Sequence, residues 1–284
     1  MQRLRIQHLT EYLFPTQVTL NQHRLLLRPR EGHDVRIESS KLTITPAHNI
    51  KWQRDVFDNS LAAVNFLERS DKLIIDSDVV IQHYEQAPFD FLLEEYAVNY
   101  PFKYAVGEQV DLAAFQRPGF ASDQQMVNDW LQQLGLSGMK TFGLLVKLNQ
   151  AISNQFRYQT RDEAGVQSPA QTLVQHSGTC RDYATLFIEA CRCLGLASRF
   201  VSGYLHAPAT EAGNATTHAW AEIYLPGTGW KGFDPTAGEV TGNNHIAVAV
   251  ARDPETVPPV SGSFIGPDAA TPTMRVNVQV NLLG

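Results

Sequence analysis

The first 84 residues form short stretches in which apolar and polar positions alternate, separated by turn-forming residues such as Asp58-Asn59-Ser60. A period of two is typical of strands with one buried face. We expect strands over residues 4–14, 18–27, 35–45, 50–56, 61–68 and 72–84. Repeated short strands of this kind predict an antiparallel β-sandwich.

The pattern becomes helical after a stretch rich in Tyr, Phe and Pro at residues 88–118, which carries no motif. A first helix is expected from the capping pair Ser122-Asp123 to about residue 134. A second is expected over 142–152, because Leu145, Leu148 and Ile152 fall on one helical face.

A third helix is predicted from Cys180 onward, with Gly195 as its C-terminal cap. Its apolar residues recur at helical spacing: Tyr183, Leu186, Phe187, Ala190, Cys191 and Leu194. The chain closes with a Pro-rich loop over 253–272, which can border a site, and a strand over 274–280. In that strand Val276, Val278 and Val280 are expected to point inward, and it can return to the N-terminal sheet.

These patterns predict an α+β protein with two domains, an N-terminal β-rich domain over 1–115 and a catalytic domain over 116–284. The chain has 284 residues, 43% of them hydrophobic and 18% charged, as expected for a globular protein with a sizeable core. Its net charge of −6 argues against nucleic acid as the main partner.

The compartment is expected to be the cytoplasm. The chain has no run of 18 apolar residues to span a membrane, and its first six residues lack the apolar core of a secretion signal. Three cysteines cannot build a disulfide framework, and a free reactive thiol suits a reducing environment.

Cys180 is the candidate nucleophile. It follows Gly178, which permits a sharp turn, and Thr179, which forms an approximate capping box with Asp182. Cys180 is therefore expected in the first helical turn, where the helix dipole favours a thiolate. There its own N–H can also bind an oxyanion. Cys191 and Cys193 lie among apolar neighbours and are expected to be core residues, and their C-x-C spacing does not predict a zinc site.

His218 is the candidate base, on a strand predicted over 217–225. One face of that strand would carry His218, Trp220, Glu222 and Tyr224, and the other is wholly apolar and expected in the core. Two further histidines, His176 and His245, follow loop sequences and are expected to be structural. The remaining histidines have no context that suggests a role: His8, His23, His33, His48, His83 and His206.

Asp234 is the candidate carboxylate. The turn Pro226-Gly227-Thr228-Gly229 is expected to fold the next strand back along the His218 strand. Counting from the turn places Asp234 near His218, where it can accept a hydrogen bond from one imidazole nitrogen and leave the other for Cys180. The alternative is an Asp-Pro turn residue without a catalytic role.

The segment from Phe156 to Arg252 resembles the core of the transglutaminase-like superfamily. The resemblance is carried by Phe156-Arg157-Tyr158, Gly178-Thr179-Cys180-Arg181-Asp182, Arg199-Phe200-Val201-Ser202-Gly203-Tyr204, His218-Ala219-Trp220-Ala221-Glu222 and Gly229-Trp230 to Asp234-Pro235-Thr236. It implies a papain-like catalytic arrangement with Cys180, His218 and Asp234 as the triad. Residues 4–31 also resemble the N-terminal region of bacterial members, through Thr10-Glu11-Tyr12 and Leu25-Leu26-Leu27-Arg28-Pro29-Arg30.

The chain lacks the carboxylate spacing of a calcium loop, so calcium activation is not implied, and no cofactor or metal is expected. The second oxyanion donor stays open. Gln175 is the glutamine near the nucleophile, but its offset differs from the papain pattern, and Tyr158 is another candidate.

The expected function is cysteine-based acyl transfer on a protein or peptide substrate through a thioester intermediate. Water as acceptor gives a peptidase or amidase, which we favour because water is always present. An amine as acceptor gives a transglutaminase with the same triad. A peptide-binding module without catalysis is the third possibility.

Overall fold

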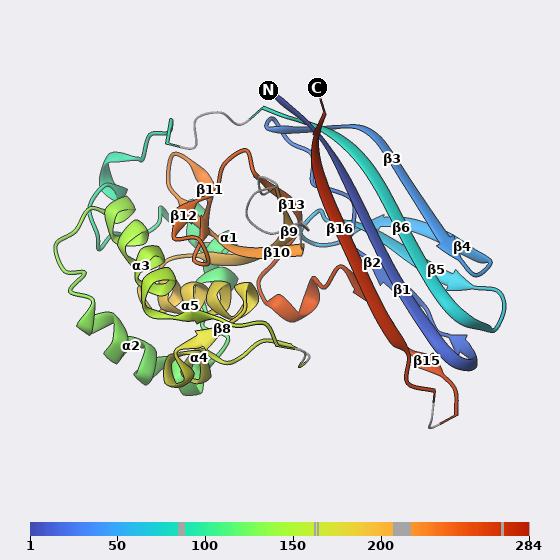
Figure 1. Ribbon diagram of the computed structural model, residues 1–284. Helices are drawn as coiled ribbons and strands as arrows, with labels where there is room; N and C mark the ends of the chain where they lie inside the picture. Colours follow the sequence, from blue (N-terminus) through green and yellow to red (C-terminus); the bar gives the residue numbers. More distant parts are fainter. Residues whose placement is uncertain (85–88, 162, 164, 207–216, 268–269, 284) are drawn as a thin grey trace.

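The computed structural model describes residues 1–84, 89–161, 163, 165–206, 217–267 and 270–283. They form two lobes, a β-rich one and a mixed one that carries the helices (Figure 1). The predicted α+β class, with a β-rich N-terminal region, is confirmed. The expected division after residue 115 stays a prediction, and residue 88 of the expected 88–118 stretch lies outside the described residues.

Two antiparallel sheets build the β-rich lobe. One joins β1 (Gln2–Leu20), β6 (Ser70–His83) and β3 (Val35–Thr45), and the other joins β2 (His23–Leu25), β5 (Ser60–Phe66) and β4 (His48–Arg54). Side chains of both sheets share one apolar cluster, including Val18 and Ile75 from the first and Val64 from the second. The predicted packing of two sheets is therefore confirmed.

The expected strands over 4–14 and 18–27 are wrong in their boundaries. The chain continues as one strand, β1, through Pro15 to Leu20, with an irregularity in register between Leu13 and Val18. A bulge of this kind accommodates a proline that cannot donate to the ladder. The chain turns after Leu20. Of the expected strand over 18–27, the part that pairs in the second sheet is β2, His23–Leu25.

The C-terminal strand β16 (Thr273–Leu283) pairs antiparallel with β1 along its whole length, so the two chain ends lie side by side (Figure 1). The predicted return to the N-terminal sheet is confirmed. Val278 and Val280 are buried, but Val276 is 48% exposed, which corrects the expectation for that residue. It lies toward the end of the strand where the core no longer covers it.

The expected loop over 253–272 contains ordered elements, apart from residues 268 and 269, which lie outside the described residues. The 3₁₀ turn η3 (Pro254–Thr256) comes first, and the short strands β14 (Val260–Ser261) and β15 (Phe264–Ile265) then pair with β2 and β1. Glu255 accepts a hydrogen bond from the Val166 N–H at 3.2 Å and lies 3.9 Å from Arg181. The segment therefore does reach the neighbourhood of Cys180.

The mixed lobe is built on a five-stranded antiparallel sheet. Its order is β12 (Glu239–Val240), β11 (Gly229–Asp234), β10 (Thr217–Leu225), β9 (Ser198–Leu205) and β13 (His245–Ala251). The central helix α5 (Cys180–Cys193) packs on the apolar face of β10, where Ala219, Ala221, Ile223 and Leu225 are all buried, as predicted.

The other helices surround α5. They are α1 (Val106–Gln116), α2 (Gln124–Gln133), α3 (Thr141–Gln155) and α4 (Pro169–Gln175), with the 3₁₀ turns η1 (Glu95–Ala97) and η2 (Ala121–Asp123). Leu145, Leu148 and Ile152 of α3 are fully buried, which confirms the predicted face. Helix α1 falls in the stretch without a predicted element, and Asp123 precedes α2 without a capping hydrogen bond from its side chain.

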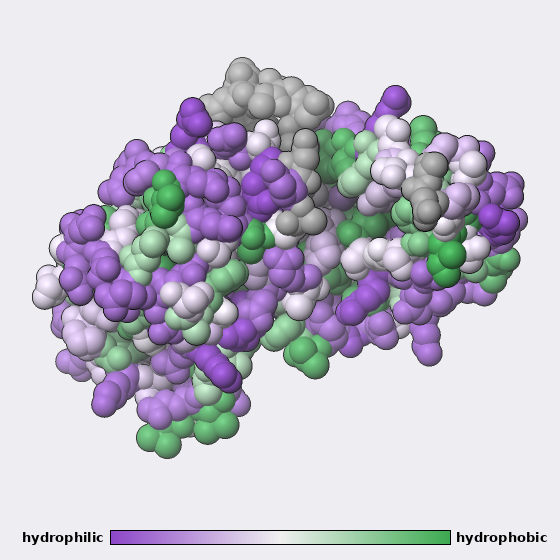
Figure 2. Space-filling model, turned by 90° about the horizontal axis from the view of Figure 1, so that it is seen from below, coloured by the Kyte–Doolittle hydropathy of each residue, from purple (hydrophilic) through white to green (hydrophobic). Residues whose placement is uncertain are grey.

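Within the described residues, none of the helices has the length and apolar character needed to cross a bilayer. Figure 2 shows that polar side chains cover most of one face of the molecule, and apolar residues form separate small patches on it.

Candidate active site

Cys180 is the first residue of α5, as the sequence predicts. Thr179 is the N-cap residue, and Asp182 accepts hydrogen bonds from its N–H at 2.8 Å and its hydroxyl at 2.9 Å. As the first helical residue, Cys180 has an N–H without an intrahelical acceptor, which leaves it available to a substrate oxygen. Of the other cysteines, Cys191 is fully buried in the core, and Cys193 is partly buried and packs against the same core.

Asp182 fixes the loop around the nucleophile. Its side chain is fully buried and also binds Arg161 at 2.8 Å and the Gln167 N–H at 2.7 Å. Burial opposes ionisation, but these hydrogen bonds outweigh it and hold the pKa of Asp182 below its ordinary value. Gly178 does not have a positive φ. It is needed for close approach, because a Cβ there would lie 2.9 Å from the Asp182 Cβ.

Tyr158 reaches the nucleophile from the short parallel pair of β7 (Arg157–Tyr158) and β8 (Ser177–Gly178). The register sets Tyr158 beside Gly178, two residues before Cys180, and its side chain lies near enough to Cys180 for the two to interact electrostatically. Burial first, and then the charge of Cys180, raise the pKa of Tyr158 to about 12. The hydroxyl therefore keeps its proton at neutral pH and can donate it in a hydrogen bond.

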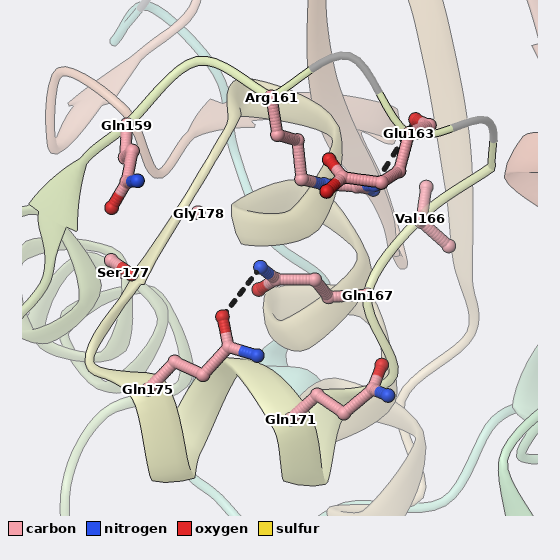
Figure 3. A pocket seen from close by; sticks show the side chains of 9 residues that line it. All are labelled: Gln159, Arg161, Glu163, Val166, Gln167, Gln171, Gln175, Ser177 and Gly178. Carbon is pink, nitrogen blue, oxygen red and sulfur yellow. Dashed lines mark hydrogen bonds between the residues drawn. The ribbon is translucent and has the colours of Figure 1, made fainter.

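Gln175, the other candidate donor, has a different position. It accepts a hydrogen bond from Gln167 Nε2 at 2.9 Å, and both side chains line a pocket of about 380 Å³ on the loop before Cys180 (Figure 3). The pocket is lined by Gln159, Arg161, Glu163, Val166, Gln167, Gln171, Gln175, Ser177 and Gly178. Its wall is rich in neutral carboxamides, and its arginine is paired with the buried Asp182.

His218 and Asp234 meet as the hairpin count predicts. The pairing of β10 with β11 runs from Leu225 opposite Gly229 to Ala221 opposite Phe233, and Asp234 follows at the His218 end. The His218 Nε2 donates to Asp234 Oδ2 at 2.7 Å, and Cys180 lies near enough to the same histidine side chain to raise its pKa. With Nε2 engaged by Asp234, Nδ1 is the nitrogen left for the sulfur.

The electrostatics of this pair favour an imidazolium. Burial alone would lower the pKa of His218, but the hydrogen bond to Asp234 and the negative charges of Asp234 and Cys180 outweigh it and raise the pKa to about 10. Burial would also raise the pKa of Asp234, yet its hydrogen bonds to His218 and His245 hold that pKa well below the ordinary value.

His245 is the site residue that sequence reasoning missed. It lies on β13 rather than in a loop, and its Nε2 donates to Asp234 Oδ2 at 3.1 Å. No local signal marks it, because β13 reaches the site through its pairing with β9.

His176 has the structural role that was expected. It ends α4 with a left-handed backbone, and its carbonyl accepts the Arg157 N–H at 2.9 Å.

Among the described residues, His218, Asp234 and His245 offer three ligand atoms within 4.8 Å of one another. Such a set has the chemistry of a divalent-metal site. The two short distances, however, join each histidine nitrogen to the same carboxylate oxygen, which is the geometry of two hydrogen bonds to one acceptor.

Comparison with known proteins places these residues in a family. Residues 130–235 match the model of the transglutaminase-like superfamily, and residues 4–82 match that of the bacterial transglutaminase-like N-terminal region. The chain is 27% identical over 274 residues to uncharacterized protein Rv2569c of Mycobacterium tuberculosis, covering 92% of this chain and 87% of that protein.

A solved structure from Cytophaga hutchinsonii, described as a candidate cysteine protease, has a similar fold. The TM-score is 0.78 at 18% identity, over 100% of this chain and 91% of the other. The superfamily match spans the segment that contains Cys180, His218 and Asp234, and the second match spans most of the β-rich lobe. The chain belongs to the transglutaminase-like superfamily and carries its bacterial N-terminal region.

Proposed function

We propose that this protein is a cysteine enzyme that hydrolyses amide bonds in proteins or peptides, with Cys180 as nucleophile, His218 as acid and base, and Asp234 as its orienting carboxylate. The observation that carries the proposal is the position of His218. It is buried, it is hydrogen-bonded to Asp234 through Nε2, and Cys180 is near enough to raise its pKa. A nucleophile, a base and an orienting group placed next to one another form the arrangement that covalent acyl transfer requires.

The reaction proceeds in two stages. The Cys180 thiolate attacks the substrate carbonyl carbon, and the imidazolium of His218 donates its proton to the amine that leaves as the C–N bond breaks. This yields a thioester between Cys180 and the acyl group. Neutral His218 then removes a proton from a water molecule, which attacks the thioester. The carboxylic acid leaves, and the proton on His218 restores the ion pair with the thiolate.

Two hydrogen-bond donors are positioned to stabilise the oxyanion of each tetrahedral intermediate. One is the N–H of Cys180, at the start of α5, where the helix dipole adds to its effect. The other is the Tyr158 hydroxyl, which is held next to the sulfur and keeps its proton. We therefore favour Tyr158 over Gln175, which bonds Gln167 in the neighbouring pocket.

The pocket in Figure 3, whose lining also includes the carboxylate of Glu163, suits a polar segment of the substrate that carries no negative charge. Gln159, Gln171 and Gln175 present carboxamides to it, and pairing with Asp182 neutralises the charge of Arg161. Carboxamides can both donate to and accept from a peptide backbone. These groups fit a polypeptide substrate better than an anionic small molecule.

The acceptor of the acyl group defines the second candidate. The same residues would support transfer from a glutamine side chain to a primary amine, with an amine replacing water in the second stage. Mass spectrometry of a mixture of Gln- and Lys-containing peptides, with and without a small primary amine, separates the two. We expect cleaved or deamidated products with and without the amine. Products linked to the amine in place of hydrolysis would establish transfer, and absence of any product that depends on Cys180 would contradict both.

The reactivity of the Cys180 thiol distinguishes the proposed enzyme from a peptide-binding module without catalysis. Because imidazolium forms at His218, alkylation of Cys180 by iodoacetamide should stay substantial below pH 7. In His218→Ala the alkylation of Cys180 at pH 6 should slow markedly, because the positive charge beside the sulfur is lost. An alkylation rate that is the same in both proteins would show that Cys180 and His218 do not interact and would favour the non-catalytic module.

A further inference from the structure

Within the described residues, the Asp234 carboxylate accepts hydrogen bonds from three donors, of which the mechanism above uses one. His218 Nε2 and His245 Nε2 both donate to Oδ2, at 2.7 and 3.1 Å, and the Thr236 N–H donates to Oδ1 at 2.9 Å. Asp234 is fully buried, so solvent does not hold its side chain in place. Its direction toward His218 is therefore set by His245 and Thr236.

The ring of His245 is itself oriented by the protein. The Gly242 N–H donates to His245 Nδ1 at 3.4 Å, which makes Nδ1 an acceptor and assigns the proton to Nε2, the nitrogen that faces Asp234. The ring also packs edge-on against Trp220, with ring centroids 5.3 Å apart. Only 7% of the side chain is exposed, so the ring has little room to turn away.

The strand that carries His245 is held by the β-rich lobe. The strand β13 pairs with β9 along one edge. The backbone of β13 also forms hydrogen bonds with residues at three places in the N-terminal region. His83 Nε2 donates to the His245 carbonyl at 3.2 Å, and the Arg30 N–H donates to the Ala247 carbonyl at 2.8 Å. The Asn59 side chain accepts from the Val250 N–H at 2.9 Å and donates to its carbonyl at 2.8 Å.

Asn59 is a strong connection because it is fully buried and fully bonded. Its carboxamide mimics the peptide unit of a neighbouring strand on Val250, and it is bound in turn by Arg30 Nη1 at 2.8 Å and by Asp55 at 2.8 Å. Loss of such buried partners is costly, because each leaves a polar group of β13 unsatisfied. The N-terminal region thus contributes directly to the geometry of β13.

We propose that His245 is a positioning residue for Asp234, and that the N-terminal β-rich lobe serves the active site by holding β13 and with it this histidine. The inference rests on the proposed function for its effect on turnover. The claim that His245 positions Asp234 does not depend on the proposed function, because the His218–Asp234 hydrogen bond can be observed without a substrate. The structural alternative is that His245 only fills space between the sheet and the lobe.

The first test compares His245→Gln with His245→Leu. Gln can place an amide N–H near the position of Nε2, whereas Leu fills a similar volume without a donor. We expect kcat to fall by roughly 10- to 100-fold in His245→Leu with KM little changed, as for a misplaced catalytic group, and to recover in large part in His245→Gln. In ¹H NMR, the low-field proton of His218 Nε2 should weaken or exchange faster in the Leu variant and persist in the Gln variant.

The second test breaks the connection from the other lobe. Asn59→Ala removes both bonds to Val250, and His83→Leu independently removes the bond to the His245 carbonyl. His23→Gln is the control, because His23 is also buried in the β-rich lobe and bonds Asn21, away from β13. We expect the His218 proton signal and kcat to fall in folded Asn59→Ala and folded His83→Leu. In His23→Gln both should stay near the wild-type values, even if that variant loses as much unfolding free energy as the other two or more.

The outcomes separate the explanations. Unchanged kcat and an unchanged His218 proton signal in His245→Leu would overturn the role of His245. Equal losses in the Leu and Gln variants would show a structural role and also overturn it. Normal signals in folded Asn59→Ala and His83→Leu would overturn the role of the lobe. If wild type shows no turnover, the proposed function fails while the NMR comparison still decides the positioning claim.

Discussion

His218 and Asp234 are joined by a buried hydrogen bond of 2.7 Å between Nε2 and Oδ2. The two residues come from adjacent strands of one hairpin, and the tight turn at Pro226–Gly229 sets the register that brings them together. Because Asp234 stays ionised and the pKa of His218 is raised to about 10, the histidine is positively charged at neutral pH. The hairpin therefore supplies a positive charge near Cys180, and in the proposed mechanism the same histidine carries the proton.

Replacement of the cysteines should separate chemistry from stability. Cys180→Ala is expected to abolish turnover and leave the fold intact, because it removes a partly exposed nucleophile. Cys191→Ala should keep its activity and lose about 1–2 kcal/mol of unfolding free energy, since Cys191 is fully buried in the core. Turnover and urea denaturation of both variants test this, and normal turnover in Cys180→Ala would remove it as the nucleophile.

Tyr158→Phe tests the second oxyanion donor. The ring is kept and only the hydroxyl near the sulfur is lost, so the fold should change little. We expect kcat to fall by about 10²-fold, the scale for loss of one oxyanion donor, with KM nearly constant. Gln175→Ala is the matched comparison and should reduce kcat much less. The reverse order of the two variants would assign the donor to Gln175.

Asp234→Asn separates an orienting carboxylate from a turn former. Asn suits turns and can still accept hydrogen bonds, but it lacks the charge that stabilises the His218 imidazolium and can favour the wrong tautomer. We expect turnover to fall by roughly 10²-fold or more while the circular dichroism spectrum stays that of the wild type. Near-normal turnover would leave Asp234 with a structural role only.

His8 is expected to make stability depend on pH in the acid range. Burial lowers its pKa to about 4, while its hydrogen bonds to Tyr204 and Thr10 are satisfied without a charge. Between pH 6.5 and about 4 the unfolded chain binds a proton at this histidine that the folded chain does not, so stability should fall as pH falls through that window and be unaffected above it.

The size of this effect is at most about 3 kcal/mol. Urea denaturation at pH 7 and pH 4.5 should show a smaller loss on acidification for His8→Gln than for the wild type. The same substitution at the exposed His33 is the control. An equal loss in all three proteins would show that His8 does not contribute.

Local sequence was sufficient to predict the position of a site residue where a single helix or hairpin determines that position. The position of Cys180 follows from the capping residues and the apolar spacing of a single helix. The approach of His218 and Asp234 follows from counting along one hairpin, because a short turn leaves little freedom in register. The α+β class followed from the change of period between the two halves of the chain.

What the sequence did not reveal depends on contacts between distant segments. His245 enters the site only because β13 pairs with β9 and is held by Asn59 and His83 from the other lobe. The strand β1 extends past Pro15 because β6 pairs with it again at Val18 and β15 pairs with Thr19 and Leu20, which overrides the local signal for a break. Helix α1 has a weakly amphipathic sequence, with one buried residue, Leu112.

The central claim is that catalysis passes through a thioester on Cys180. The most direct measurement is intact-protein and peptide mass spectrometry after rapid acid quenching of the enzyme with a cleavable peptide, for wild type and Cys180→Ala. The account predicts an adduct with the mass of the acyl fragment on the peptide that contains Cys180, formed and consumed during turnover and absent from the variant. Steady turnover with no adduct at Cys180, or an equal adduct in the variant, would contradict it.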